Sequence, residues 1–194
     1  KSGLNKAFVV DEKSVNEFGL EKEFIKKLVK NSYIDSYHIR DRGLYLIYAS
    51  DELDEKNAPN IINYLERFKK ELKARAEAKD GLYPWYRLQR PREKALFEAG
   101  EKIIVPYRAE QNKFGYDSEQ RYNDGGDVRV IVITDPTFAV KYVLAVLNSK
   151  LMNFYYQFIG RKKGKMYEYF VEPLQKIPIA CADYRKQREL GELV

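Results

Sequence analysis

The segment 147–179 places the strongest local constraint on how this chain of 194 residues can fold. It opens with an apolar and aromatic stretch that predicts a helix, and Ser149 is able to cap a helix there. Leu147, Phe154 and Tyr155 of this stretch, with the segment 177–179, are expected to pack in the core. A glycine-bracketed basic loop, 160–165, follows, and the proline-bounded extended segment 177–179 closes the series. A helix that presents a mobile cationic loop beside tyrosines indicates a binding surface for a polyanion.

Composition predicts a folded domain, because 44% of the residues are apolar. A chain of 194 residues fits one ordinary domain, or two small ones that share a core. The net charge of +6 tilts modestly toward acidic partners such as nucleic acid. The single cysteine, Cys181, excludes an internal disulfide and is expected to pack, which fits a cytoplasmic protein. No apolar run reaches 18 residues, so no membrane partner is expected.

Short strand and helix patterns alternate irregularly along the chain. They predict an α+β fold with a small mixed or antiparallel sheet and several packed helices. Strands are expected at 7–10, 102–105 and 128–134, with a hairpin or two joined strands over 33–48. Helices are expected at 15–30, 59–79 and 138–147, and in the tail after Tyr184.

Signatures of catalysis are missing from the sequence. There is no nucleophile elbow, dinucleotide loop, Walker loop or H-E-x-x-H motif. The single histidine, His38, has no visible catalytic partner, so a structural or surface role is expected. Acidic residues stand beside lysine at 21–23 and 71–73, where a magnesium-dependent nuclease site is an alternative to ordinary helix surface. These observations favour a binding module over an enzyme.

The basic loop is the strongest binding feature. Its glycines, Gly160 and Gly164, would let backbone N–H groups approach a phosphate. The alternative is a plain solvated loop. The candidate DNA-binding residues here are Arg161, Lys162, Lys163, Lys165 and Tyr167.

Two further segments carry side chains suited to DNA. The arginines of 85–92 can make bidentate contacts with base edges or phosphates, while Trp85 beside them is expected in the core. The polar loop 107–122 suits base readout, although any exposed loop has such a composition. The candidates from these segments, with one lysine near the start, are Lys6, Arg87, Arg90, Arg92, Arg108, Asn112, Lys113 and Arg121.

Five motifs occur along the chain in this order: GLNKAFVV near the start, YLIY at 45–48, PNIINYLERFKKELKAR at 59–75, WYRLQRPREKALFEAGEKIIVP at 85–106 and LNSKLMNFYYQFIGRKKGKMYEYFVEPLQKIPI at 147–179. Their order and spacing resemble the TaqI-like C-terminal target-recognition (specificity) domain. That domain follows the catalytic domain in adenine-specific DNA methyltransferases and fused restriction-modification enzymes. The resemblance covers about residues 3–180, so it implies a single target-recognition domain over 3–180, with a charged tail or helix over 181–194. The absence of a sustained heptad pattern favours the fused form over separate specificity subunits.

The resemblance implies a domain that clamps duplex DNA against an upstream methyltransferase domain and reads the target in the major groove. S-adenosylmethionine and the N/D-P-P-Y/F/W motif belong to that upstream domain. The motif is not in this sequence, so no cofactor and no catalysis are expected of this chain by itself. Because the chain starts with Lys1 and not Met, we expect it to be a piece of a longer protein, whose parent is a methyltransferase and could also cleave DNA. The alternative is a basic protein-interaction or regulatory domain that does not bind nucleic acid.

Overall fold

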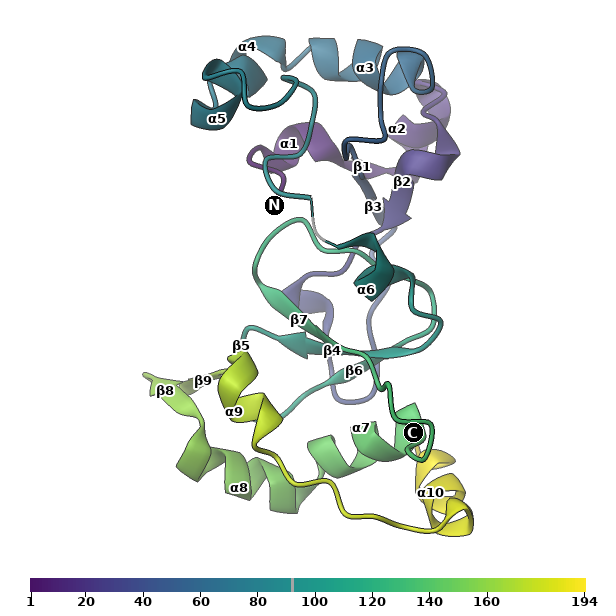
Figure 1. The fold of residues 1–194 in the computed structure, drawn as a ribbon, viewed down its shortest axis with the longest axis vertical. Coiled ribbons are helices and arrows are strands. Elements are labelled where there is room, and N and C mark those ends of the chain that lie inside the picture. The colour runs from purple at the N-terminus through teal and green to yellow at the C-terminus, as the bar shows by residue number, and fades with distance from the viewer. Residues whose placement is uncertain (92) are drawn as a thin grey trace. The chain divides into compact units, whose positions relative to one another are not determined.

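The computed structural model describes residues 1–91 and 93–194 and confirms an α+β fold (Figure 1). Within those residues the strands form three antiparallel sheets of three strands each. The chain divides into two compact units. Unit 1 holds residues 1–28, 42–94 and 121–125, and unit 2 holds residues 29–41, 95–120 and 126–194. The expected domain limits at 3 and 180 stay a prediction.

Unit 1 is a small sheet accompanied by short helices. The sheet has the order β1-β3-β2, and its strands are β1 (Val9–Asp11), β3 (Leu44–Ile47) and β2 (Ile25–Lys27). The helices are α1 (Asn5–Phe8), α2 (Glu12–Glu17), the 3-10 turn η1 (Lys22–Phe24), α3 (Pro59–Glu66), α4 (Lys69–Lys73) and α5 (Ala76–Lys79). Strand β1 starts at Val9, two residues later than the strand predicted at 7–10. Large apolar side chains from the sheet and from α1, α3 and α4 fill the interior, among them Phe8, Ile47, Ile61, Leu65 and Leu72.

The predicted helix over 15–30 is wrong. Helix α2 ends at Glu17, and Gly19 follows with a φ of +58°, which a helix cannot continue. The chain then extends into β2, which pairs with β3 in the register Ile25↔Ile47. The residues of β2 pair with residues about twenty positions further along the chain. This tertiary pairing outweighs the local helix preference that the spacing of apolar residues indicated.

The predicted helix over 59–79 is broken into α3, α4 and α5. Phe68 leaves the helical region with φ −112° and ψ 5°, and Arg75 is extended with φ −63° and ψ 134°. Arg75 departs because its guanidinium donates to three backbone carbonyls outside the helix, those of Ser2, Trp85 and Arg87. The predicted end of the helical region before Gly81 is confirmed, since α5 ends at Lys79.

Unit 2 contains two sheets. The first has the order β6-β4-β7, with strands β6 (Gly115–Asp117), β4 (Lys102–Pro106) and β7 (Val128–Ile131). The second has the order β5-β9-β8, with strands β5 (Arg108–Ala109), β9 (Met166–Glu168) and β8 (Arg161–Lys163). The strand predicted at 102–105 is confirmed by β4, and all five of its residues are buried. Of the two strands expected over 33–48, the second is confirmed as β3 (Leu44–Ile47). The first is wrong, because η2 (Asn31–Tyr33) and a single bridge, Ile34↔Ile39, take its place.

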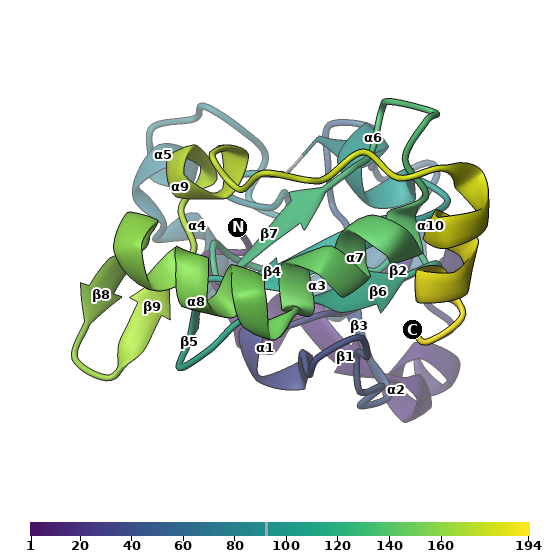
Figure 2. The same ribbon diagram turned by 90° about the horizontal axis from the view of Figure 1, so that it is seen from below.

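The helices of unit 2 are α6 (Lys94–Glu98), α7 (Val140–Asn148), α8 (Lys150–Ile159), α9 (Val171–Gln175) and α10 (Tyr184–Gly191). Helix α7 packs against β4 and β6, and α10 packs against α7 (Figure 2). Ser149 caps α8 by accepting a hydrogen bond from the backbone N–H of Met152, as predicted. The predicted terminal helix after Tyr184 is also confirmed. The core between these elements includes Ile103, Val105, Phe114, Leu144, Leu147, Tyr156 and Tyr169.

Three packing predictions are corrected by the structure. Phe154 was expected in the core, but 57% of its surface is exposed because it lies on the outer face of α8. Cys181 is exposed rather than packed. Trp85 is only half-buried; it lies edge-on to Tyr86 and beneath the ammonium of Lys69. His38 is exposed, in agreement with its expected surface role.

Candidate nucleic-acid interface

The basic segment after α8 is a β-hairpin and not a mobile loop. Strands β8 and β9 pair antiparallel in the register Lys163↔Met166, so Gly164 and Lys165 form a two-residue turn. Gly164 has a φ of +63°, a backbone conformation that glycine adopts without a steric penalty. All three residues of β8 are exposed. Within the described part of the chain no ion pair involves Lys162, Lys163 or Lys165, so the hairpin presents uncompensated positive charge.

The second sheet of unit 2 aligns two arginines on one carboxylate. In its register Arg108 and Arg161 both stand opposite Glu168, one on each side of the central strand β9. Arg108 donates from Nε and Nη2 to Oε1 of Glu168 at 2.8 and 2.5 Å. Arg161 Nε lies 3.3 Å from Oε2. The Glu168 side chain is 3% exposed, so the carboxylate lies beneath the two guanidinium groups.

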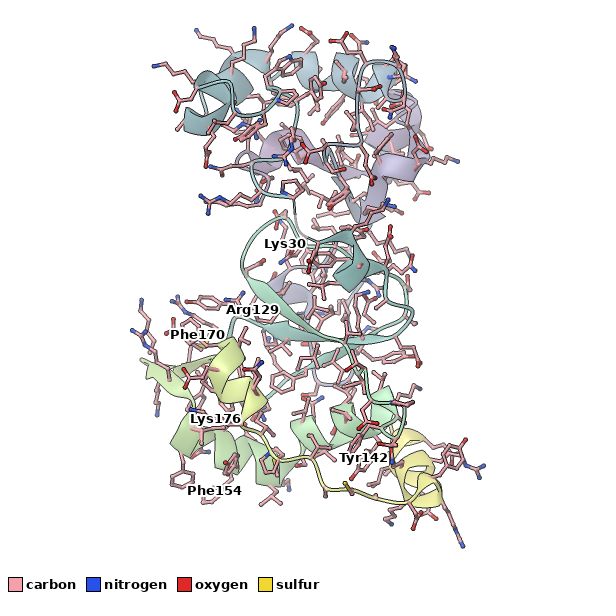
Figure 3. All side chains as sticks on the ribbon, in the orientation of Figure 1. Lys30, Arg129, Tyr142, Phe154, Phe170 and Lys176 are labelled. Atoms are coloured by element: carbon pink, nitrogen blue, oxygen red, sulfur yellow. The ribbon has the colours of Figure 1, made fainter. Side chains whose placement is uncertain are left out.

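Aromatic rings flank this row. The hydroxyl of Tyr107 donates to Oε1 of Glu168 at 3.1 Å, and the Tyr107 ring meets Phe170 edge-on at 5.7 Å. The guanidinium carbons of Arg108 and Arg129 lie 4.8 and 5.1 Å from the centroid of the Tyr107 ring. Stacking of this kind favours arginine over lysine and holds its plane in place. We call Arg108, Arg129, Arg161, Glu168, Tyr107 and Phe170 the arginine cluster; Figure 3 labels Arg129 and Phe170.

Electrostatics keeps the central pair ionised. The hydrogen bond from Arg108 lowers the pKa of Glu168 below its ordinary value, with smaller effects of Tyr107 and Arg161 in the same direction. The same hydrogen bond raises the pKa of Arg108. The Glu168 carboxylate is therefore charged at neutral pH and holds the guanidinium of Arg108 in a fixed orientation.

The structure brings several predicted DNA-binding residues together on this sheet. Arg161, Lys162, Lys163 and Lys165 are exposed on the hairpin. Tyr167 is half-buried and carries the ammonium of Lys162 at 5.6 Å from its ring centroid. Arg108 joins them through β5, which pairs with β9.

Two residues of the polar loop lie inside the protein instead. Asn112 is 4% exposed; its side chain donates to the carbonyl of Leu147 and accepts from the hydroxyl of Tyr169. Arg121 is 5% exposed. Their polar groups suggested base readout, but in this structure they serve the interior and are not presented to a ligand. Lys113 is half-buried.

Lys6, Arg87 and Arg90 lie in unit 1. Lys6 pairs with Glu71 at 2.7 Å, and Arg87 Nη2 donates to Asp51 at 2.6 Å. Arg90 is 73% exposed in its side chain and lies 3.5 Å from Glu77. Arg92 lies outside the described residues. DNA contact by all of these residues stays a prediction.

Sequence reasoning missed Glu168, Tyr107, Arg129 and Phe170. A usable signal was the absence of any acidic residue between positions 136 and 167, which makes Glu168 the first acid after six basic residues. Its pairing with Arg108, sixty positions earlier, depends on strand register and has no local signature.

No group of three metal-ligating side chains occurs in residues 1–91 and 93–194. In the same ranges no helix is long and apolar enough to cross a membrane.

Comparison with known proteins agrees with the fold. The TaqI-like C-terminal specificity domain family matches residues 26–179. A solved structure of the Type IIL restriction-modification enzyme MmeI in complex with DNA is similar in fold, with a TM-score of 0.64 and 11% sequence identity. The similarity covers 99% of this chain and 26% of that one, so this chain spans about a quarter of the length of its structural relative. A search of curated proteins gave no match.

Proposed function

The chain belongs to the family of TaqI-like C-terminal specificity domains, and from this premise we propose that it recognises duplex DNA for a restriction-modification enzyme. A fold shared with a restriction-modification enzyme that was solved on DNA supports the proposal. The observation that carries it is the sheet β5-β9-β8, in which lysines without ion pairs on the hairpin lie in the same sheet as the oriented arginines Arg108 and Arg161.

The two kinds of cation suit two tasks in DNA recognition. Lysines without acidic partners gain most from meeting phosphates, since each neutralised phosphate releases counterions. Arginines held in a plane by hydrogen bonds and ring stacking suit the directional contacts that read base edges. The hairpin lysines would fix the backbone of the duplex while the arginine cluster faces its bases.

We propose in addition that this chain does not itself catalyse a reaction, and that the complete protein is an adenine-specific methyltransferase. S-adenosylmethionine would then bind to a separate catalytic domain that also contacts the DNA. The lack of a methyltransferase motif in this sequence supports that division of labour.

A titration with random-sequence duplex DNA at several salt concentrations tests the proposal. We expect binding at low salt that weakens linearly in log–log form as salt rises. Absence of binding at low salt, or affinity that does not change with salt, contradicts the proposal.

One observation favours the alternative of a protein-interaction domain. Leu151, Phe154 and Phe158 are 67%, 57% and 71% exposed on one stripe of α8, and apolar stripes of this kind often meet another protein. A folded chain that ignores DNA but loses a protein partner on Phe154→Ser replacement would support this alternative.

A further inference from the structure

We propose that Arg108 reads a guanine base in the major groove of bound DNA, and that Glu168 is its positioning residue. This inference rests on the proposed function and adds a ligand class and a second residue to it. The guanidinium group of Arg108 carries five N–H donors in a planar fork.

Only one edge of that fork is occupied. Nε and Nη2 of Arg108 both donate to Oε1 of Glu168, and the Tyr107 ring covers one face of the plane. The hydrogen bonds from Arg108 to Glu168 come from Nε and Nη2 and not from Nη1, and 37% of the side chain is exposed. The end of the fork, one N–H from each Nη atom, is therefore free to donate two parallel hydrogen bonds.

Guanine is the base that matches this pair of donors. It presents two neighbouring acceptors, N7 and O6, in the major groove, whereas adenine presents an acceptor beside a donor. An end-on arginine therefore pairs with guanine and leaves at least one bond unmade with any other base. A lysine could not impose the same geometry, because its ammonium is a point charge on a flexible stem.

A phosphate also offers two acceptors, so charge must decide between the two ligands. The carboxylate of Glu168 offsets the positive charge of Arg108 but leaves its donors in place. That pairing weakens attraction to an anion and costs little toward a neutral base edge. Lys163 and Lys165 lie on the β8-β9 hairpin beside β5 and form no ion pair among the described residues, so they are the better phosphate ligands.

Glu168 is itself held on both oxygens. Oε1 also accepts from the hydroxyl of Tyr107 at 3.1 Å, and Oε2 faces Arg161 at 3.3 Å. A carboxylate fixed in this way restricts Arg108 to one orientation before DNA arrives. Such preorganisation raises discrimination because less side-chain freedom is lost on binding.

Selection of bound sequences from a random duplex pool, followed by titration of modified duplexes, tests the inference. In the selected sequence each required guanine is replaced in turn by 7-deazaguanine, which lacks N7, or by inosine, which lacks only the minor-groove amino group. At one position we expect 7-deazaguanine to weaken binding by the wild-type protein about 5- to 150-fold, and inosine to have little effect.

Arg108→Ala should bind both duplexes alike at that position while keeping preferences elsewhere. Arg108→Lys should discriminate less than wild type at that position, because an ammonium can still donate to N7 but is not held in a fixed plane. Arg108→Lys keeps a positive charge beside Glu168, so this variant is expected to fold even if Arg108→Ala does not. Glu168→Gln should reduce discrimination at the same position only. Arg185→Ala is the matched control, since this arginine is 89% exposed on α10, at the other end of unit 2 from the hairpin (Figure 2).

The outcomes separate the inference from the function on which it rests. If the wild-type protein binds no duplex, both the proposed function and the guanine contact of Arg108 are wrong. Wild-type protein that selects a sequence while Arg108→Ala weakens every duplex equally leaves DNA recognition intact and overturns the reading of guanine. Glu168→Gln with an unchanged sequence preference overturns the positioning role.

Discussion

The ring of Tyr156 occupies the space in which a side chain at Gly160 would stand. A Cβ atom on Gly160 would lie 2.5 Å from Cδ1 of that ring and 2.7 Å from the Tyr156 carbonyl oxygen. Tyr156 is 1% exposed and stacks on Tyr169 with ring centroids 4.7 Å apart, so the ring has no room to move. The close approach of Gly160 to the ring and carbonyl of Tyr156 at the end of α8, rather than close approach to a phosphate, therefore explains the glycine.

Gly160→Ala should destabilise the protein by about 1–3 kcal/mol, the usual cost of an extra methyl group in a filled interior. Urea unfolding followed by circular dichroism measures the loss. Gly164→Ala is the matched control, because open space surrounds that position and only its φ of +63° opposes alanine. That backbone conformation costs about 1–2 kcal/mol for an alanine. If Gly160→Ala unfolds at the wild-type urea concentration, the packing explanation is wrong.

Much of the fold was predictable where the signal is local. Ser149 marks the start of α8 because a serine hydroxyl can satisfy a free backbone N–H within the first turn. The segment 102–105 reads as a strand because its apolar residues are β-branched and a proline follows. The segment 15–30 was not predictable in this way, since the strand Ile25–Lys27 exists only through its pairing with Leu44–Ile47.

The candidate site was predictable only in its charges. The basic residues of 161–165 are plain in the sequence, and the structure places them on one hairpin. Whether Arg108 lies beside them depends on the register of β5 with β9, which the sequence does not contain locally. Asn112 was misplaced for the reverse reason, because a polar residue in a polar loop gives no sign that its amide is enclosed.

Arg75→Lys should destabilise unit 1 by about 2–4 kcal/mol, because a lysine cannot replace several charged hydrogen bonds at once. Arg75 donates to the carbonyls of Ser2, Leu72, Trp85 and Arg87 at distances between 2.6 and 3.0 Å. Trp85 is the single tryptophan, so its fluorescence reports unfolding of this region directly.

The control for Arg75→Lys is Lys73→Ala on the exposed side of α4. It should change the stability by less than about 0.5 kcal/mol. Equal effects of the two substitutions, or an unchanged fluorescence transition for Arg75→Lys, would show that the four carbonyls do not depend on Arg75.

Lys102→Met should cost about 3–5 kcal/mol, since it removes the buried ammonium that forms an ion pair with the buried carboxylate of Asp117. Lys102 Nζ lies 2.7 Å from Asp117 Oδ2, with both side chains fully buried, and also donates to the carbonyl of Phe97 at 2.6 Å. The double variant Lys102→Met with Asp117→Leu should recover part of that loss, because no isolated charge remains. A double variant that is less stable than Lys102→Met would refute this account.

Replacement of Lys162, Lys163 and Lys165 by alanine should weaken binding to all duplexes and flatten the salt dependence. The slope of log affinity against log salt should fall by about 1 for each lysine that meets a phosphate. Lys186→Ala on α10 is the control, since Lys186 already pairs with Glu189 at 3.2 Å. A triple variant with the wild-type slope would mean that the hairpin does not contact the DNA backbone.

Glu168→Gln should destabilise the protein at neutral pH and lose this effect in acid. The guanidinium of Arg108 lowers the pKa of Glu168 in the folded protein below the ordinary value of 4.5. Folding therefore favours the ionised form, and this contribution is present above pH 4.5 and is lost as the pH falls through the folded pKa. Unfolding free energies of both proteins, measured by urea titration from pH 7 to pH 3, should converge at the acidic end.

The control for Glu168→Gln is Glu189→Gln at an exposed position on α10. It should differ from wild type by less than about 0.5 kcal/mol at neutral pH. A gap between wild type and Glu168→Gln that stays constant down to pH 3 would show that the ion pair with Arg108 does not stabilise the fold.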